Sequence, residues 1–398
     1  EHGLFFLVYA KIINETHMFG MTHKTYLGVD FGTSSIKVVE LGVEKKEPVL
    51  LNYGEINLSL LESIRSGDQG DYDAQITIFL RALLEKVGSK AKEVYVAMPA
   101  FIGLVALVEF PQMNEKELES AIQFESHKYI PSPLHEVALS WEVVGERTVI
   151  AEDSGNQIKK LEVLLVAALN KEVERYESYI RSVGYDMQLL ELETFSMVRS
   201  TVHDPTETYL VIDIGSRATN FVLVENKLVK MNRNLDVGGR DITRNLMESL
   251  NISFDRAEVL KKSSKDFLNQ AESKMTFLPL EMIVGEVRRM LQSREVKNPQ
   301  ARKIHGIILS GGTASMTGLP QYFESMLGIP ATVAHPWSGI RYDQKLQSSI
   351  ERMGTSYSVA LGLALRGVER EIQVPTSRES LSRWAGWIKE KMAMKIGK

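Results

Sequence analysis

Two stretches of the sequence each place an aspartate and a glycine before a turn of small, hydroxyl-bearing residues. The first is YLGVDFGTSSIKVV, residues 26–39, and the second is YLVIDIGSRATNFVLV, residues 209–224. When the two are aligned, Asp30 matches Asp213 and Thr33 matches Ser216. Each stretch is typical of two strands joined by a tight turn. The repeat therefore predicts two related domains that face each other, each presenting one such hairpin.

These residue types suit the binding of phosphate and magnesium. A turn led by glycine lets successive backbone N–H groups converge on an anion, because no Cβ stands in the way. Serine and threonine hydroxyls add further donors. A carboxylate would repel phosphate but would hold Mg²⁺, usually through the waters that this ion loses slowly. We therefore predict that Asp30 and Asp213 contact Mg²⁺ through waters while the turns bind the phosphates of a nucleotide.

The predicted phosphate-binding residues of the two hairpins are Gly32, Thr33, Ser34, Ser35, Gly215, Ser216 and Thr219. The alternative is a pair of ordinary hairpins, which are common in proteins. Either hairpin alone favours that alternative, whereas two hairpins in register favour a nucleotide clamp.

A third glycine site lies in IHGIILSGGTASMTGLPQYF, residues 304–323. A β-branched strand ends at Ser310, Gly311 and Gly312 form a tight turn, and a helix is expected to begin near Leu319. The backbone carries no side chain at these two glycines. Together with Thr313, which follows them, it would lie flat against a base or a ribose. The alternative is a simple strand-to-helix turn. The sequence contains no GxxxxGK[ST] P-loop, and neither hairpin has the GxGxxG of a dinucleotide-binding fold.

The elements that position these residues belong to a chain of 398 residues with a net charge of −4 and no cysteine. Its length indicates two or more domains, and its mild charge does not suggest a nucleic-acid partner. The absence of cysteine excludes disulfides and cysteine zinc sites. No apolar run is long enough to span a membrane. Residues 1–20 lack the features of a signal peptide, and we expect an extension with little structural role.

Residues 108–169 predict a small extra module between the two hairpins. Asn114 is placed to cap a helix, with Glu117 at the capping-box position, and Pro131 ends that helix. Strands are expected before the helix and twice after it. The module is therefore a strand, a helix and two strands.

The two hairpins and the third glycine site, in this order, resemble the superfamily of actin, Hsp70 and the sugar kinases. Within it, VEFPQMNEKELESAIQFESHKYIPSPLHEVALSWEVVG and NLDVGGRDITRNL resemble the PilM family of type IV pilus assembly proteins. The resemblance covers roughly residues 26–367. It implies an α/β fold: an actin-like two-domain fold with duplicated nucleotide-clamp domains and an inserted subdomain, 1C, of the type that FtsA and PilM share.

The resemblance implies the following boundaries: an extension (1–23), subdomain 1A (24–92, 171–205 and a closing helix, 356–372), subdomain 1C (93–170), subdomain 2A (206–232 and 303–355), subdomain 2B (233–302) and a tail (373–398).

The resemblance also implies ATP and Mg²⁺ as ligands and roles for further residues. Gly238 and Gly239 would lie near the ribose or the phosphates, with a flexible loop as the alternative. Glu258 and Lys261 would lie near the adenine, with a surface ion pair as the alternative. Glu193 stands where related hydrolases place the group that orients the attacking water. A helix N-terminal acid is the stronger reading there, so no catalytic residue is assigned and any ATPase activity is expected to be slow.

The function that the resemblance implies is that of a cytoplasmic scaffold at the inner membrane, which assembles the platform of a type IV pilus. Its partner would be the short N-terminal cytoplasmic peptide of the membrane protein PilN, and self-association is left open. We expect the peptide near the insert, on the surface of Gln123–Ile130 or the strand Val105–Phe110. The alternatives are a membrane-tethered division protein like FtsA and, third, a small-molecule kinase, for which no evident Asp base is present.

The end of the chain, Ser380–Lys398, predicts a basic amphipathic helix. Its apolar stripe comprises Leu381, Trp384, Ala385, Ile388, Met392 and Ile396. Such a helix would lie at an anionic membrane surface. The alternatives are a helix folded back onto its own domain and a frayed tail.

Overall fold

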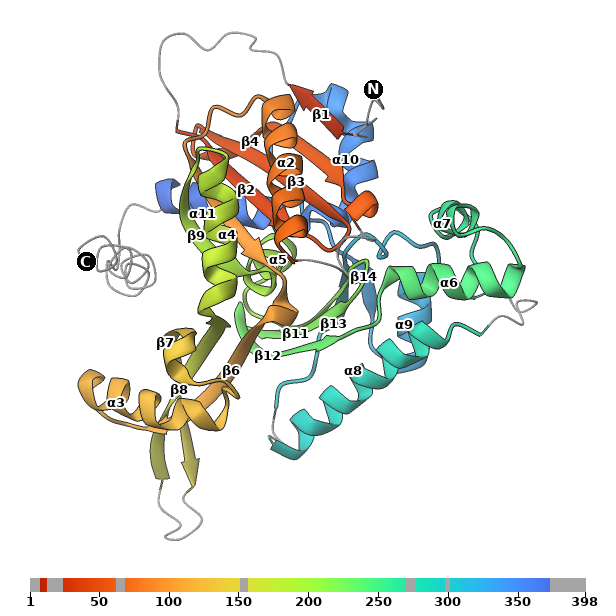
Figure 1. Cartoon of the computed structure of the whole chain (residues 1–398). Helices are drawn as coiled ribbons and strands as arrows, with labels where there is room; N and C mark the ends of the chain where they lie inside the picture. The colour runs from red at the N-terminus through yellow and green to blue at the C-terminus, as the bar shows by residue number, and fades with distance from the viewer. Residues whose placement is uncertain are drawn as a thin grey trace.

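The computed structural model describes residues 8–12, 24–61, 69–150, 157–269, 276–297 and 301–372. Its strands form three sheets, which Figure 1 shows as two larger bodies with a smaller one projecting from the first. Each of the larger sheets carries one of the two aspartate hairpins.

The first sheet has the order β1-β4-β3-β2-β5-β9. The bounds of its strands are Val8–Ile12 for β1, Tyr26–Phe31 for β2, Ser35–Glu44 for β3, Glu47–Asn57 for β4, Glu93–Met98 for β5 and Asp186–Leu192 for β9. Strand β2 is antiparallel to β3 and parallel to β5. All six residues of β2 are buried, as expected for a central strand that is covered on both faces.

The second sheet has the order β12-β11-β10-β13-β14. The bounds of its strands are Thr208–Ile214 for β10, Thr219–Glu225 for β11, Leu228–Leu235 for β12, Gly306–Ser310 for β13 and Ala331–Val333 for β14. Three antiparallel strands are followed by two parallel ones, as in β4-β3-β2-β5-β9 of the first sheet. The predicted duplication therefore extends from the hairpins to the order of whole sheets.

Strand β1 corrects the expectation for the start of the chain. Residues 1–20 were expected to have little structural role, but Val8–Ile12 pairs antiparallel with Ile56–Asn52 of β4. This strand extends the first sheet beyond the five-strand pattern of the second. Because β1 pairs with β4, the backbone groups along that side of β4 are not left unpaired at the edge of the sheet.

The projecting body is the predicted insert. Its sheet has the order β6-β8-β7, and the bounds are Gly103–Pro111 for β6, Val137–Ile150 for β7 and Gln157–Leu169 for β8. Helix α3, Glu115–Glu125, begins at Asn114, whose side chain accepts from the Glu117 amide while the Glu117 carboxylate accepts from the Asn114 amide. The predicted capping box and the order strand, helix, strand, strand are both confirmed.

The remaining helices cover the two larger sheets. Their bounds are Gln69–Val87 for α2, Asn170–Ser182 for α4, Glu193–Thr201 for α5, Gly239–Leu250 for α6, Phe254–Lys261 for α7, Leu278–Lys297 for α8, Leu319–Leu327 for α9, Gln347–Met353 for α10 and Ser358–Ile372 for α11.

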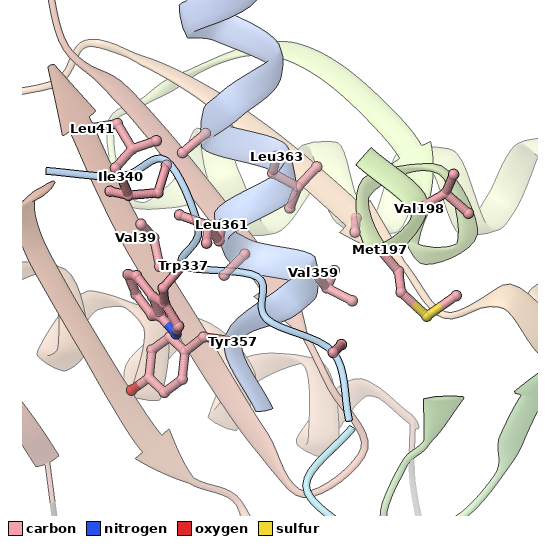
Figure 2. Packing of buried hydrophobic residues seen from close by; sticks show 14 of the residues in the cluster. Val39, Leu41, Met197, Val198, Trp337, Ile340, Tyr357, Val359, Leu361 and Leu363 are labelled. Carbon is pink, nitrogen blue, oxygen red and sulfur yellow. The ribbon is translucent and has the colours of Figure 1, made fainter. Parts of the chain in front are cut away.

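Helix α11 is the centre of the core that the two halves share. Figure 2 shows Val359, Leu361 and Leu363 of α11 between the strands of the first sheet and Met197 of α5. The approach is close because of glycine: a Cβ at Gly362 would lie 1.9 Å from the carbonyl oxygen of Ser196. Helices α5 and α11 therefore pack backbone to backbone, and α11 also packs against β2 and β3 of the first sheet.

Candidate functional site

Asp30 and Asp213 lie at equivalent positions near the ends of β2 and β10. Asp30 stands opposite Lys37 of β3, and Asp213 stands opposite Asn220 of β11. Asp30 is only 6% exposed. Burial raises its pKa to about 6, and the charge of Asp213 adds to the rise while that of Lys37 opposes it. The duplicated fold thus brings the two predicted carboxylates within electrostatic reach of each other.

Burial likewise raises the pKa of Asp213 to about 6, against the hydrogen bond with Ser310 and the charge of Lys37. Glu193 joins them from the first position of α5, where its Oε1 accepts from the Ala100 amide at 2.9 Å. Burial raises the pKa of Glu193 to about 8, reinforced by Asp213 and Asp30. Three carboxyl groups therefore share one poorly solvated space, which disfavours full ionisation in the absence of a cation.

Lys37 is a functional candidate that reasoning from the sequence missed. Its positive charge lowers the pKa of all three carboxyl groups, and its Nζ lies 3.7 Å from Oε1 of Glu55. The signal was present, because Lys37 follows Asp30 by seven residues just as Asn220 follows Asp213. In a hairpin of this length, that spacing places the two side chains on the same face.

Asn220 supplies an acceptor that has no donor. It is 3% exposed, and its Nδ2 donates to Oγ1 of Thr194 at 3.1 Å, but its Oδ1 is buried and accepts from none of the described residues. A buried acceptor normally finds a donor. Within the described part of the chain, no group of three acidic or histidine side chains is arranged to hold a metal directly. A hydrated ion, whose waters donate, fits both observations better than a bare ion.

The turns of the two hairpins require their glycines for the same reason. A Cβ at Gly32 would lie 2.9 Å from the Ser35 carbonyl oxygen, and one at Gly215 would lie 2.9 Å from that of Ala218. Thr33, Ser34 and Ser216 are partly exposed at these turns. The turns thus keep accessible hydroxyl groups beside bare backbone, as the sequence predicted.

Thr219 and Ser35, two of the hydroxyl residues predicted to bind phosphate, lie away from the exposed parts of the two turns. Thr219 is fully buried, and its hydroxyl donates to the Val237 carbonyl at 2.7 Å, so the side chain is committed to holding β11 against the loop before α6. Ser35 is 2% exposed at the start of β3. The alternation of side chains in a strand turns both residues inward, and the prediction that they face phosphate does not fit this placement.

Three glycine-containing segments meet beside Asp213. The Gly239 amide donates to the Gly215 carbonyl at 2.8 Å. A Cβ at Gly238 would lie 2.6 Å from the Ser216 carbonyl oxygen, and a Cβ at Gly239 would lie 2.3 Å from Oγ1 of Thr313. Gly238 and Gly239 are therefore parts of a packed turn, not of a flexible loop.

Gly311 and Gly312 play different parts in the same corner. Gly311 has a φ of +85°, and a Cβ there would lie 2.9 Å from Oδ1 of Asp213. No atom lies within 4 Å of the place where a Cβ of Gly312 would be. Gly311 is thus needed for the turn, whereas Gly312 leaves open space next to the bare backbone, which suits a flat ligand.

Glu258 and Lys261 form a half-buried pair at this corner and not an ordinary surface pair. Lys261 is 6% exposed, and its Nζ lies 2.7 Å from Glu258 Oε2, 3.0 Å from the Gly239 carbonyl oxygen and 2.8 Å from Oγ1 of Thr243. Burial opposes the ionisation of Glu258, but hydrogen bonds from Lys261 and Thr243 hold its pKa at about 2. Burial lowers the pKa of Lys261 in spite of this partner. The pair ties α7 to the glycine turn that starts α6.

A second site is a groove of about 650 Å³ between the insert, the first domain and the second. The insert contributes α3, β7 and β8, the first domain contributes β9, α5 and α11, and the second contributes the turn before β12 and the start of β12. Its walls combine apolar side chains, with Trp141 and Phe195 among the larger, and nearly as many polar and charged ones. A concavity that offers both apolar surface and polar groups can bind a ligand and fix its orientation.

The segments expected to bind a partner do not line this groove. The lining includes no residue of Val105–Phe110 or of Gln123–Ile130. Val108 and Phe110 are instead buried in the core of the insert. On α3, the residues that reach the groove are Glu115 and Glu119, which precede the predicted surface. The predicted tail helix, Ser380–Lys398, lies outside the described residues.

Comparisons with known proteins agree with this architecture. The model of a family described as "Type IV pilus assembly protein PilM" matches residues 28–368. A solved structure titled "PilM-PilN type IV pilus biogenesis complex" superposes with a TM-score of 0.69 at 24% identity, covering 86% of this chain and 98% of that one. This likeness shows the actin-like two-domain fold that the family resemblance implied.

Cell division proteins are more distant relatives. FtsA of Enterococcus hirae is 22% identical over 341 residues, which covers 76% of each chain. FtsA of Streptococcus pneumoniae is 21% identical over 340 residues, covering 76% of this chain and 74% of that protein.

Among the described residues, no helix has the length and apolar character needed to cross a bilayer.

Proposed function

The chain belongs to the PilM family of type IV pilus assembly proteins, and on that premise we propose that it is an ATP-binding scaffold of the pilus assembly platform. Its partner is the cytoplasmic N-terminal peptide of PilN, and its place is the cytoplasmic face of the inner membrane. The observation that carries this proposal is the groove of about 650 Å³, because it is separate from the carboxylate clamp and is built from both domains and the insert.

Mg·ATP fits the clamp residues in three ways. The turn with Thr33 and Ser34 and the turn with Ser216 offer hydrogen-bond donors to phosphate oxygens. Asp30 and Asp213 would accept hydrogen bonds from the waters of Mg²⁺, whose charge would relieve the crowding of the carboxyl groups. The open space beside Gly312 would take the ribose or the base. The Mg²⁺ ion would supply positive charge, and its waters would supply donors, to a corner that holds three buried carboxyl groups and the unsatisfied Asn220 acceptor.

The contacts of Glu193 fit a structural part in the clamp, and the expectation of slow hydrolysis stays a prediction. Burial raises its pKa to about 8 in the ligand-free protein, reinforced by Asp213 and Asp30. It also accepts from the Ala100 amide, which holds the segment between β5 and the insert. We therefore assign Glu193 a positioning role at the start of α5.

Helix α5 gives a physical link between the two sites. Glu193 at its start belongs to the clamp, and Phe195 and Arg199 further along it line the groove. Thr194 accepts from Asn220 and donates to Asn232 of β12 at 3.3 Å, so the same helix is bonded to the second domain. Domain closure on nucleotide would move α5 and β12 together and so alter the groove, which is a coupling between two distinct sites.

The test uses a fluorescein-labelled PilN cytoplasmic peptide and its anisotropy with increasing protein. Saturable binding that weakens in Trp141→Ala, with Phe124→Ala as a matched aromatic control on the insert surface, would support the proposal. Phe124 is 69% exposed, and it does not line the groove. Absence of binding, or equal loss in both variants, would contradict it.

A further inference from the structure

The charges around the groove are divided between its walls. The insert contributes three carboxylates, Glu115, Glu119 and Glu142, and no cation. The two domains contribute four cations, Arg199, Lys227, Arg366 and Arg370, and two carboxylates, Glu191 and Glu369. The insert wall is thus negative and the opposite wall carries a net positive charge, with apolar side chains between them. An occupant of uniform charge would be repelled by one of the walls.

Two arginines of the positive wall, Arg199 and Arg366, differ in their hydrogen-bond partners. Arg199 donates to both carboxylate oxygens of Glu191, at 2.8 and 3.1 Å, and to the Gly362 carbonyl at 2.8 Å. Its Nε also lies 3.8 Å from Glu369 Oε2. This guanidinium therefore holds α5 to β9 and α11 through three hydrogen bonds.

Arg366 lies one helical turn before Arg370 on α11 and has no such partner among the described residues. Its Nε is buried, and it donates to none of the described residues. Glu369 and Glu191 act on it only through space, and the nearby charge of Arg199 opposes its ionised form. Glu191 is already taken up by Arg199. A buried N–H donor without an acceptor costs free energy, so a ligand acceptor for the Nε of this partly buried arginine would be favoured.

We propose that Arg366 is the specificity-determining residue of the groove and pairs with an acidic side chain of the partner peptide. The inference rests on the proposed peptide-binding function. A carboxylate matches the planar fork of a guanidinium better than a neutral carbonyl does, and the bond is charge-assisted. The acid would be flanked by apolar residues that fill the space beside Trp141 and Phe195. Basic side chains of the same peptide would face the carboxylates of the insert wall.

The test measures dissociation constants of the PilN cytoplasmic peptide for wild type, Arg366→Met, Arg366→Lys and the control Arg352→Met, which changes an exposed arginine of α10. Each acidic residue of the peptide is also replaced in turn by its amide. We expect Arg366→Met to weaken binding by about tenfold or more, Arg366→Lys to weaken it less, and Arg352→Met to leave it unchanged. One acid-to-amide change should weaken binding to wild type but have no further effect on Arg366→Met.

A purely structural role would give a different result. Because Arg366→Met removes a partly buried charge whose Nε has no acceptor among the described residues, its melting temperature should not fall. Arg366→Glu should regain affinity for the peptide whose critical acid is changed to lysine. If wild type binds the peptide and Arg366→Met binds equally well, the inference is wrong while the proposed function stands. Tight binding of a peptide without any acidic residue would also overturn it. If no peptide binds wild type, the proposed function itself fails.

Discussion

The substitution Asp30→Asn tests two properties of the clamp separately. One is the free energy that the buried carboxylate costs the ligand-free protein, and the other is the binding of Mg·ATP. Burial raises the pKa of Asp30 from 3.8 to about 6. A rise of about 2 in pKa corresponds to about 3 kcal/mol against the ionised form. At pH 7 the ligand-free protein bears this cost, because Asp30 is then mostly ionised in a site where it is 6% exposed. An asparagine of nearly the same shape would avoid it.

We therefore expect Asp30→Asn to stabilise the ligand-free protein by about 1 to 3 kcal/mol at pH 7. The lower figure allows for Lys37, which loses a partner, and for the other carboxyl groups, which titrate together with Asp30. The sign follows from proton uptake. Between about pH 4 and pH 6 the folded protein retains a proton that the unfolded chain has released, so wild-type stability falls as pH rises through this window. The gain from the substitution should vanish near pH 4.

The assay is thermal unfolding of wild type, Asp30→Asn and the exposed control Asp186→Asn, each with and without millimolar ATP and Mg²⁺. Wild type should be stabilised by nucleotide, by about 2.7 kcal/mol at a hundredfold excess over the dissociation constant. Asp30→Asn should melt a few degrees higher without ligand and gain little from Mg·ATP. A lower melting temperature without ligand, or a full response to Mg·ATP, would refute this reasoning.

Three further predictions concern the other contacts of the two sites. Lys261→Met should destabilise the protein by about 1 to 3 kcal/mol in chemical denaturation, because the half-buried Glu258 carboxylate loses its 2.7 Å partner and keeps only the exposed Lys262 at 3.0 Å, and adding Glu258→Gln should recover part of the loss. Lys230→Met removes a 2.6 Å ion pair between β12 and Glu162 of the insert. The ratio of peptide affinities with and without Mg·ATP should then approach one, whereas an unchanged ratio would exclude this pair from the coupling. Trp141→Ala should weaken peptide binding by about tenfold or more with ATP affinity unchanged, as measured by calorimetry, and a parallel loss of ATP binding would point to misfolding.

The local sequence was sufficient to predict the duplication of the hairpins and the start of helix α3. The match of Asp30 with Asp213 predicted two sheets with one clamp hairpin each, and the structure confirms the duplicated sheet order. Asn114 and Glu117 predicted the start of α3, because a capping box uses only neighbouring residues. Such features depend on a few consecutive residues and need no knowledge of distant packing.

The features that were missed depend on distant partners or on the direction of single side chains. The Thr219 hydroxyl points to the Val237 carbonyl, which only the path of the loop before α6 determines. The groove draws on elements from α3 to α11, so no continuous pattern marks it. Strand β1 gains its role by pairing with β4, more than forty residues later in the chain. Arg366 resembles any helical arginine until its neighbours are known.

Hydrogen exchange of the full chain, alone, with Mg·ATP and with the PilN peptide, tests the central claim most directly. The account predicts that ATP protects the turns around Gly32 and Gly215, that the peptide protects the groove strand β7, and that each ligand alone slows exchange in α5, residues 193–201. Peptide protection confined to Val105–Phe110 and Gln123–Ile130, or no change at α5 with either ligand, would contradict it.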